Sequence, residues 1–364
     1  MSLNRPKHGG NLAWAACVSG CSPVDILDFS ASINPLGPPQ SAIAAIQAHL
    51  PDLKGYPDPS YGRLRQCLGQ MHGLSPDWIL PGNGAAELLT WASRELAELD
   101  AVYVIAPAFG DYGRSLRAFN ANLLPLSLNL DCNSDWDLEI QQWLAPHNQG
   151  TRAYGLIINT PHNPTGRLVS TQTIRQCLNH FALVVVDEAF IDFLPPDRAQ
   201  SVVDWVEEYP NLVVLRSLTK FYSVPGLRIG YAVAHPDRLY RWQQWRDPWA
   251  VNVLAEAAAI AMVSDLEFQQ QTWAWLPSAR SHLFQGLSDL PGLMPYPGVV
   301  NFLLVRCLPS VLDVQQALLK QHQILIRDCL SFAELGDRHF RVAVRLKSDH
   351  DRLLDGLRSI LKSV

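Results

Sequence analysis

The chain has 364 residues, of which 48% are hydrophobic and 17% are charged. Its 29 basic and 34 acidic side chains give a net charge of −5, which argues against a nucleic-acid-binding surface because such a surface needs clustered positive charge. High apolar content and low net charge also exclude an intrinsically disordered chain. The basic residues are six Lys and 23 Arg, so each lysine can be considered individually.

The sequence contains no secretion or membrane signal. The N-terminal stretch MSLNRPKHGG lacks the apolar run that a signal peptide needs, and no segment approaches the roughly 20 apolar residues that span a bilayer. Seven cysteines are scattered between Cys17 and Cys329, and they suggest neither a disulfide framework nor a metal site. We therefore expect reduced thiols, no metal, no membrane partner and a cytoplasmic protein.

Short apolar runs alternate with helical patterns through the middle of the chain. The spacing predicts a helix over Ala85 to Leu96. Runs that are apolar on both faces and separated by helical lengths indicate a parallel α/β sheet covered by helices on both sides. The predicted strands are Ala101–Ala106, Tyr154–Ile158, Leu183–Val186, Leu212–Leu215 and Ile229–Val233.

The last third of the chain has a different pattern. A long helical stretch is predicted from Arg238 to Val263. Weaker strands follow, with helices between them, and this order indicates a smaller α+β domain. These strands are Phe302–Val305, Ile324–Ile326 and Phe340–Val344.

Ligands bind beyond the carboxyl ends of the strands in parallel sheets, so polar residues at strand ends are candidates for a site. Gly82-Asn83-Gly84 precedes the helix that begins at Ala85, whose free N–H groups suit a phosphate. A plain turn is the alternative. Asn163 lies in a loop after strand 154–158, where two prolines favour extended backbone, and a turn before a helix is the alternative there.

A carboxylate and a lysine follow two further buried strands. Asp187 comes directly after Val186, and a carboxylate in such a place needs a cation or proton donor unless it is partly exposed or caps a helix. Lys220 lies just past strand 212–215, unlike the other five lysines. A desolvated lysine has a lowered pKa and can attack a carbonyl carbon. Arg228, eight residues later between two glycines, suits a phosphate.

A phosphate cradle, an Asn, an Asp and a lone Lys are together what a protein needs to hold pyridoxal phosphate. With these motifs in order along almost the whole chain, the sequence resembles the aspartate-aminotransferase-like family of pyridoxal-phosphate enzymes, called fold type I. The resemblance implies an α/β fold with a large domain over residues 41–250, whose mostly parallel seven-stranded sheet lies between helices. It also implies a smaller α+β domain over 251–364, with residues 1–40 contributing to that domain and to the active site.

The resemblance implies roles for single residues. Lys220 would form a Schiff base with the cofactor and Asp187 would pair with its pyridine nitrogen, so these two are the expected catalytic residues. Asn163 would bind the ring oxygen, and Phe109 would stack on the ring. The cofactor phosphate would be held by Gly84, Ala85, Ala86, Ser217, Thr219 and Arg228.

Three further positions of the family pattern concern the partner subunit, the substrate and the ring oxygen. Tyr56, in Tyr56-Pro57-Asp58-Pro59, resembles the tyrosine that reaches the cofactor of the neighbouring subunit, which implies a homodimer. Arg341 resembles the arginine that binds the substrate α-carboxylate. Phe190 stands where many aminotransferases have Tyr, so the ring oxygen would depend on Asn163 alone, which disfavours ordinary transamination.

Within the family the chain is similar to the histidinol-phosphate aminotransferase group and, more specifically, to the threonine-phosphate decarboxylases of cobalamin biosynthesis. This likeness lies in His8-Gly9-Gly10-Asn11, in the DFSASINPLG segment that begins at Asp28, and in the segments around Arg327 and Arg341. It implies decarboxylation of L-threonine O-3-phosphate to (R)-1-amino-2-propanol O-2-phosphate and carbon dioxide. The expected substrate-binding residues are His8, Asn34, Asn163, Arg327 and Arg341, with Arg345 as a helper.

Three other functions are alternatives to this one. A nucleotide-binding α/β protein could use Gly82-Asn83-Gly84, but the sequence has no P-loop and no complete dinucleotide fingerprint. A cofactor-free binding protein is the second. The third is a histidinol-phosphate or related amino-acid aminotransferase that uses 2-oxoglutarate and glutamate.

Overall fold

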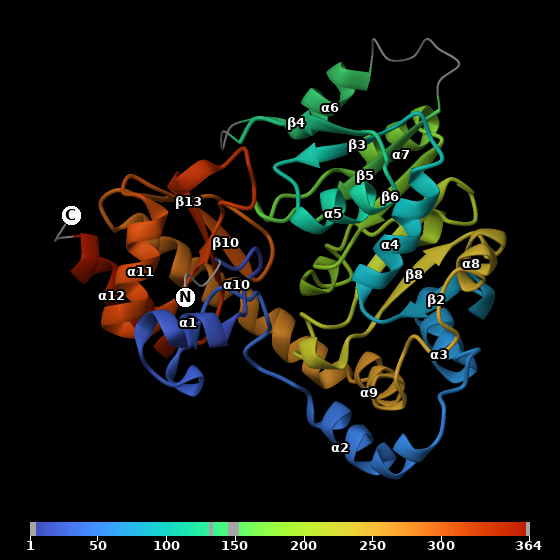
Figure 1. Ribbon diagram of the computed structural model, residues 1–364, viewed down its shortest axis with the longest axis horizontal. Coiled ribbons are helices and arrows are strands. Elements are labelled where there is room, and N and C mark those ends of the chain that lie inside the picture. The colour runs from blue at the N-terminus through green and yellow to red at the C-terminus, as the bar shows by residue number, and fades with distance from the viewer. Residues whose placement is uncertain (1–4, 131–133, 145–152, 362–364) are drawn as a thin grey trace.

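The computed structural model describes residues 5–130, 134–144 and 153–361. Figure 1 shows a large sheet with helices on both faces beside a smaller group of strands and helices. The N-terminal helix α1 (Leu12–Ser19) lies in the smaller group, next to α11 (Val311–His322), although most of the chain separates them.

The large sheet has seven strands in the order β2-β8-β7-β6-β5-β3-β4. Every strand runs in one direction except β8, which is antiparallel to both of its neighbours, so the prediction of a mostly parallel seven-stranded sheet is confirmed. Strand β8 reverses because residues 218–229 return the chain without a crossover helix. The strands are β2 (Ile79–Gly82), β3 (Ala101–Ala106), β4 (Leu123–Ser127), β5 (Tyr154–Asn159), β6 (Leu183–Asp187), β7 (Leu212–Ser217) and β8 (Gly230–Ala234).

Alternating side chains of each strand enter two separate hydrophobic clusters, one on each face of the sheet. Val184 and Val186 belong to one cluster, and Val185 belongs to the other. Helices α4 (Ala85–Leu96), α5 (Gly110–Ala118) and α8 (Pro236–Gln243) contribute to the cluster of Val185. The other face is covered by α2 (Gln40–His49), α3 (Gly62–His72), α6 (Trp136–Leu144), α7 (Thr171–His180) and α9 (Val253–Val263).

The C-terminal part forms an antiparallel sheet in the order β12-β13-β10-β9. The strands are β9 (Leu293–Pro295), β10 (Phe302–Cys307), β12 (Arg327–Asp328) and β13 (His339–Ala343), with α10 (Leu266–Ser288), α11 and α12 (Lys347–Leu361) around them. The N-terminal segment joins this part, because β1 (Leu27–Asp28) pairs in parallel with β11 (Ile324–Leu325). The domain limits near residues 40 and 250 stay a prediction.

One predicted element was wrong. The long helix expected from Arg238 to Val263 is divided into α8 and α9, because Pro248 disfavours helical backbone at Asp247 and Asn252 then caps a new helix by accepting from the Ala255 N–H at 2.9 Å. The strand expected at 324–326 is confirmed as β11, which pairs with β1 and ends at Leu325. The next strand, β12, begins at Arg327, pairs with β13 and was not predicted.

In the described ranges, no helix combines the length and the apolar character that crossing a membrane requires. The six cysteines within those ranges are free, and no group of His, Cys, Asp and Glu there could hold a metal ion. The seventh cysteine, Cys132, lies outside the described residues.

Candidate active site

A cavity of about 390 Å³ lies at the carboxyl ends of the central strands of the large sheet. Side chains from the N-terminal segment, the large sheet and the C-terminal sheet line it together. Most of the predicted site residues meet here, although they are far apart in the sequence. The lining includes His8, Ser32, Phe109, Tyr112, Asn163, Asp187, Phe190, Thr219, Lys220, Arg228, Arg327 and Arg341.

Lys220 follows β7 and reaches into the cavity. Its Nζ donates to Ser217 Oγ at 3.1 Å and lies 5.4 Å from the centroid of the Phe190 ring. Burial lowers the pKa of the Lys220 amine, and the nearby Arg228 and Arg341 lower it further, while Asp187 opposes them. A lowered pKa increases the share of neutral amine, which is the form that attacks an aldehyde.

Asp187, the last residue of β6, has both carboxylate oxygens bonded. Its Oδ2 accepts from Tyr112 Oη at 2.6 Å, and its Oδ1 accepts from the Ala189 N–H at 2.9 Å. Burial raises the pKa of Asp187, whereas the Tyr112 hydrogen bond and the Lys220 charge oppose that rise. Tyr112 was not predicted, but its position one helical turn after Phe109 is a signal that sequence reasoning could have used.

The Asn163 side chain links the large sheet to the C-terminal sheet. Its Oδ1 accepts from Arg341 Nη1, and its backbone N–H donates to Asn159 Oδ1 at 2.6 Å. Asn159 in turn donates to the Asp187 carbonyl at 2.8 Å. These bonds fix Asn163 and Asp187 relative to each other. The ring of Phe109, from the large domain, lies edge-on to Tyr112 at 5.6 Å.

Gly84, Ser217, Thr219 and Arg228 form a small cup beside Lys220. A Cβ at Gly84 would lie 2.4 Å from Arg228 Nη2, and the Gly84 φ is 77°, so only glycine fits between the helix and the guanidinium. Ser217 Oγ and Thr219 Oγ1 are 2.8 Å apart. The first N–H groups of α4, at Ala85 and Ala86, have no partner within the helix, so the cup suits a phosphate.

Tyr56 does not line the cavity of its own chain. Its side chain is 81% exposed and packs against Trp249, with ring centroids 4.5 Å apart. The predicted contact of Tyr56 with a cofactor therefore cannot be made within one chain.

Two arginines face each other at the other end of the cavity. Arg327 of β12 and Arg341 of β13 are direct partners across the antiparallel pair, and both are buried. Arg327 Nη2 donates to Ser331 Oγ at 2.6 Å and to the Lys7 carbonyl. Burial lowers the pKa of Arg341 to about 10. Like charges placed opposite each other in a sheet are destabilising unless an anion lies between them.

The structure does not bring Asn34 or Arg345 to the cavity. Asn34 Nδ2 donates to the Phe221 carbonyl at 2.9 Å and to Thr272 Oγ1 at 2.8 Å, so its amide hydrogens are used inside the protein. Arg345 pairs with Asp349 at 2.9 Å. The predictions that Asn34 and Arg345 bind substrate are therefore wrong.

Ser32, two residues before Asn34, lines the cavity instead. Its side chain is 4% exposed, and its hydroxyl has no hydrogen-bond partner in the described part of the chain. A buried hydroxyl without a partner is costly, so this group is available to a bound ligand. The DFSASINPLG segment therefore identified the correct loop, but the residue of that loop that lines the cavity is Ser32 and not Asn34.

Comparison with known proteins agrees with this geometry. The family model for aminotransferases of class I and II matches residues 24–357. The chain belongs to this family. Threonine-phosphate decarboxylase from Salmonella typhimurium is 38% identical over 100% of the chain and 99% of that protein, and histidinol-phosphate aminotransferase from Symbiobacterium thermophilum is 32% identical over 93% and 91%. The crystal structure of histidinol-phosphate aminotransferase from Clostridium acetobutylicum superposes with a TM-score of 0.83 at 26% identity, covering 93% of this chain and 100% of that one.

Membership of the aminotransferase class I and II family confirms three predictions: the fold type I architecture, an enzyme and pyridoxal phosphate as the cofactor. The residues present fit that cofactor. Gly84 leaves the space that a Cβ would fill beside Arg228, the buried Asp187 suits a ring nitrogen, and Lys220 supplies the amine.

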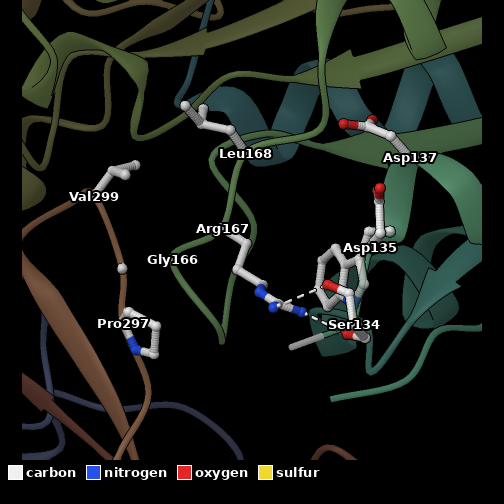
Figure 2. Close-up of a pocket in the computed structure, with 10 residues that line it drawn as sticks. Ser134, Asp135, Asp137, Gly166, Arg167, Leu168, Pro297 and Val299 are labelled. Atoms are coloured by element: carbon white, nitrogen blue, oxygen red, sulfur yellow. Dashed lines mark hydrogen bonds between the residues drawn. The ribbon is translucent and has the colours of Figure 1, made fainter. Parts of the chain in front are cut away.

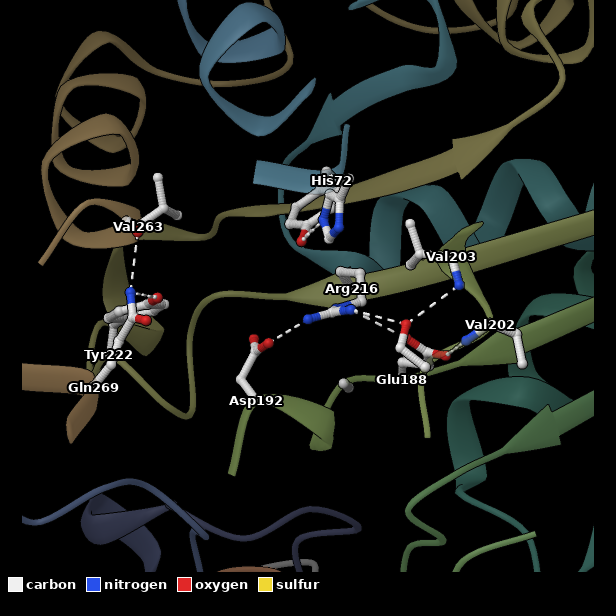
Figure 3. Close-up of polar contacts among 12 residues, drawn as sticks. His72, Glu188, Asp192, Val202, Val203, Arg216, Tyr222, Val263 and Gln269 are labelled. Carbon is white, nitrogen blue, oxygen red and sulfur yellow. Dashed lines mark hydrogen bonds and ion pairs between the residues drawn. The ribbon is translucent and has the colours of Figure 1, made fainter. Parts of the chain in front are cut away.

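Behind the cavity, a buried ion-pair network ties the ends of β6 and β7 together (Figure 3). Glu188 and Arg216 point away from the cavity, opposite to their neighbours Asp187 and Ser217. Arg216 Nη1 lies 3.1 Å from Glu188 Oε2, and Arg216 also pairs with Asp192. In this aminotransferase-family fold the network fixes the two strand ends that carry Asp187 and Lys220.

A second cavity, of about 440 Å³, lies between residues 134–137 and 297–299 and holds none of the predicted site residues (Figure 2). Arg167 crosses it and donates to Ser134 Oγ at 2.9 Å. Arg167 follows the loop of Asn163, so this contact supports that loop from outside the active site. Since the predicted site residues line the other cavity, that cavity is the candidate active site.

Proposed function

We propose that the chain decarboxylates L-threonine O-3-phosphate, giving (R)-1-amino-2-propanol O-2-phosphate and carbon dioxide, in the cytoplasm and for cobalamin biosynthesis. The facing pair of Arg327 and Arg341 carries the proposal. Arg341 has no carboxylate within ion-pair distance in the described part of the chain, and Arg327 has only Asp328, at 3.8 Å. Two buried guanidiniums with so little compensating charge suit a phosphorylated amino acid, which offers a carboxylate and a phosphate. The name and full-length similarity of the Salmonella typhimurium relative support the same substrate.

Neighbouring residues at one end of the cavity bind the two anionic groups of the substrate separately. We assign the carboxylate to Arg341 and Asn163, whose mutual hydrogen bond fixes the guanidinium plane. The phosphate goes to Arg327 and His8, with Ser32 as an additional donor. This arrangement orients the bond between Cα and the carboxylate so that it is the bond that breaks.

Proton positions follow from the chain's own groups. Pyridoxal phosphate, when bound, supplies the electron sink for the bond that breaks at Cα. Tyr112 and Lys220 favour the ionised form of Asp187 against the effect of burial, and that carboxylate would hold a proton on the cofactor's ring nitrogen. Lys220 Nζ, which has a lowered pKa, delivers the proton to Cα after carbon dioxide leaves. Phe109, which lines the cavity, would cover one face of the cofactor ring and keep water from it.

A homodimer completes the site in this proposal. Four apolar or aromatic side chains are exposed, namely Tyr56, Leu53, Leu50 and Trp249. Tyr56 contacts the Trp249 ring but does not line the active-site cavity of its own chain. Exposed patches of this kind mark interaction surfaces. We propose that Tyr56 reaches the phosphate cup of the partner subunit and adds to the residues that each chain supplies there, Gly84 to Ala86, Ser217, Thr219 and Arg228.

The second candidate is histidinol-phosphate aminotransferase activity, because relatives with that name are 32% identical over most of the chain. Phe190 argues against it: a phenylalanine cannot donate to the cofactor's ring oxygen, which leaves that oxygen to Asn163.

One experiment separates the two activities. Purified protein loaded with pyridoxal phosphate receives threonine phosphate without any keto acid, and released carbon dioxide is measured. Release in many turnovers supports the decarboxylase. Absence of release, together with amino transfer from histidinol phosphate to 2-oxoglutarate, would contradict it.

A further inference from the structure

A third cavity, lined by several basic side chains, lies outside the active site and adjoins it; we call it the outer cavity. It has a volume of about 480 Å³ and shares His8 and Asp111 with the active-site cavity. Three segments line it: residues 5–8 of the N-terminal segment, the first turns of α5, and residues 328–331 after β12. None of the residues assigned above to cofactor binding lies in this outer cavity.

The outer cavity has an excess of positive charge. Four of its side chains are permanently basic and two are acidic, so its lining carries 4 − 2 = +2 in a chain whose net charge is −5. Asp111 pairs with Arg114 at 2.8 Å, and Asp328 pairs with Arg5 at 3.3 Å. The two remaining bases are Lys7 and Arg117.

Lys7 and Arg117 are exposed, and neither has a carboxylate within ion-pair distance in the described part of the chain. An exposed charge without a counter-ion costs little, but two of them in one concave surface raise the local concentration of anions. The excess charge therefore acts on molecules that approach the cavity from solvent.

The direction of the Arg117 side chain shows that its positive charge lies toward the outer cavity. A Cβ at Gly113 would lie 3.0 Å from Arg117 Nη1, so the arginine runs back along α5 over a residue that has no side chain. This direction takes the guanidinium toward Gly110 and Asp111, where the helix begins and the cavity is lined. The positive end of the helix dipole adds to the same field.

Ser331 connects the two cavities. It lines the outer cavity, and its Oγ accepts from Arg327 Nη2 at 2.6 Å. Arg327 lines the active site, where we assign it to the substrate phosphate. An anion bound in the outer cavity near Ser331 would therefore lie close to the Arg327 guanidinium, to which we assign the substrate phosphate.

We propose that the outer cavity is a capture site for phosphate monoester dianions, which binds the phosphate of the incoming substrate and passes it to Arg327 and His8. The assignment rests on the proposed function only in requiring a phosphorylated substrate. Lys7 and Arg117 are its specific determinants, because the other two arginines are neutralised by their own acids.

The test measures the rate at which substrate associates with the holoenzyme. A stopped-flow instrument records this rate through the change in the visible spectrum of the bound cofactor. Wild type is compared with Lys7→Gln, Arg117→Gln and the double variant, at low salt and at high salt. Arg352→Gln, an exposed arginine of α12 that lines neither cavity, is the charge-matched control. The probes are threonine phosphate and unphosphorylated L-threonine.

For threonine phosphate at low salt, the double variant should associate at least about threefold more slowly than wild type, because local charge raises association rates by 10-fold or more. The difference should disappear at high salt, where the Debye length falls to a few ångströms. L-Threonine should associate equally with all variants. Isothermal titration with inorganic phosphate should show weaker binding to the double variant.

Equal association rates of wild type and double variant at low salt would overturn the capture site, as would an equal loss with L-threonine or with Arg352→Gln. Carbon dioxide release is measured separately on wild type. A spectral change without carbon dioxide release contradicts the proposed function but leaves the capture site measurable. Histidinol phosphate replaces threonine phosphate as the probe when the latter gives no spectral change.

Discussion

Tyr112 donates a hydrogen bond of 2.6 Å to Asp187, and both side chains are buried beneath the active-site cavity. The bond opposes the effect of burial on the Asp187 pKa. It also fixes the carboxylate plane, since the other oxygen accepts from Ala189. Tyr112 thus acts through Asp187 as a positioning residue.

Replacing Tyr112 with Phe removes one hydrogen bond to an ionised group, which is worth about 1.5–3 kcal/mol. The pKa of Asp187 should rise, so the acid limb of the activity profile should move to higher pH. Cofactor affinity, measured by titrating apoenzyme, should fall by about 10-fold or more. Tyr240→Phe, an exposed tyrosine on α8, is the control and should change neither quantity.

Replacing Lys220 with Ala should abolish the visible absorbance of the bound cofactor and essentially all turnover. In wild-type apoenzyme, the rate of cofactor attachment should rise with pH as the amine loses its proton. The midpoint should lie below 10.5, the value of an unperturbed lysine, because burial lowers the Lys220 pKa. A midpoint at or above that value, or turnover in the Ala variant, would contradict the assignment.

Replacing Arg327 with Ala should weaken binding of threonine phosphate by about 100-fold, since a charge-assisted bond in a buried site is lost. Cofactor affinity should change little, because Arg327 lies at the substrate end of the cavity. The two dissociation constants are measured on the same preparation. Equal losses in both would show that Arg327 acts on the structure of the site as a whole.

The homodimer proposal predicts complementation between two inactive variants. Tyr56→Ala and Lys220→Ala place their defects in different subunits of a shared site, so a mixed dimer contains one site with both residues intact. Statistical mixing should restore up to about a quarter of wild-type activity. Each variant alone, carried through the same subunit exchange, is the control, and no recovery would contradict a site shared through Tyr56.

His162, next to Asn163, should make stability depend on pH. Burial lowers its pKa from 6.5 to about 3, so below pH 6.5 the unfolded chain binds a proton that the folded chain does not. Stability should therefore fall as pH falls through this window. Between pH 8 and pH 5, His162→Asn should lose about 2 kcal/mol less unfolding free energy than wild type, measured by urea titration. Equal losses would contradict the prediction.

The catalytic end of the site could be predicted because its residues end buried strands. Asp187 and Lys220 each follow an apolar run, and such runs are readable in a single sequence. The same holds for the fold, whose strands alternate with helices. The helix expected over 238–263 failed because Asp247-Pro248 interrupts a pattern that otherwise has helical periodicity.

The substrate end depends on contacts that no local pattern records. Arg327 and Arg341 face each other only because β12 pairs with β13, and the family resemblance supplied both of them without that pairing. Ser32 and Asn34 are two residues apart in one loop, and only their surroundings show that the hydroxyl faces the cavity while the amide is used inside. Tyr112 differs from these residues, because its position one helical turn after Phe109 is visible in the sequence, although only the structure shows its hydrogen bond to Asp187.

The alternation at the ends of β6 and β7 limits how this protein can change. Asp187 faces the cofactor side while Glu188 faces Arg216, so deleting one residue from β6 would exchange the two carboxylates and leave the guanidinium against the wrong partner. Insertions and deletions should therefore be excluded from these two strands during evolution. The exposed side chain of Lys7 carries no such constraint, so the charge of the outer cavity can change during evolution without disturbing either strand.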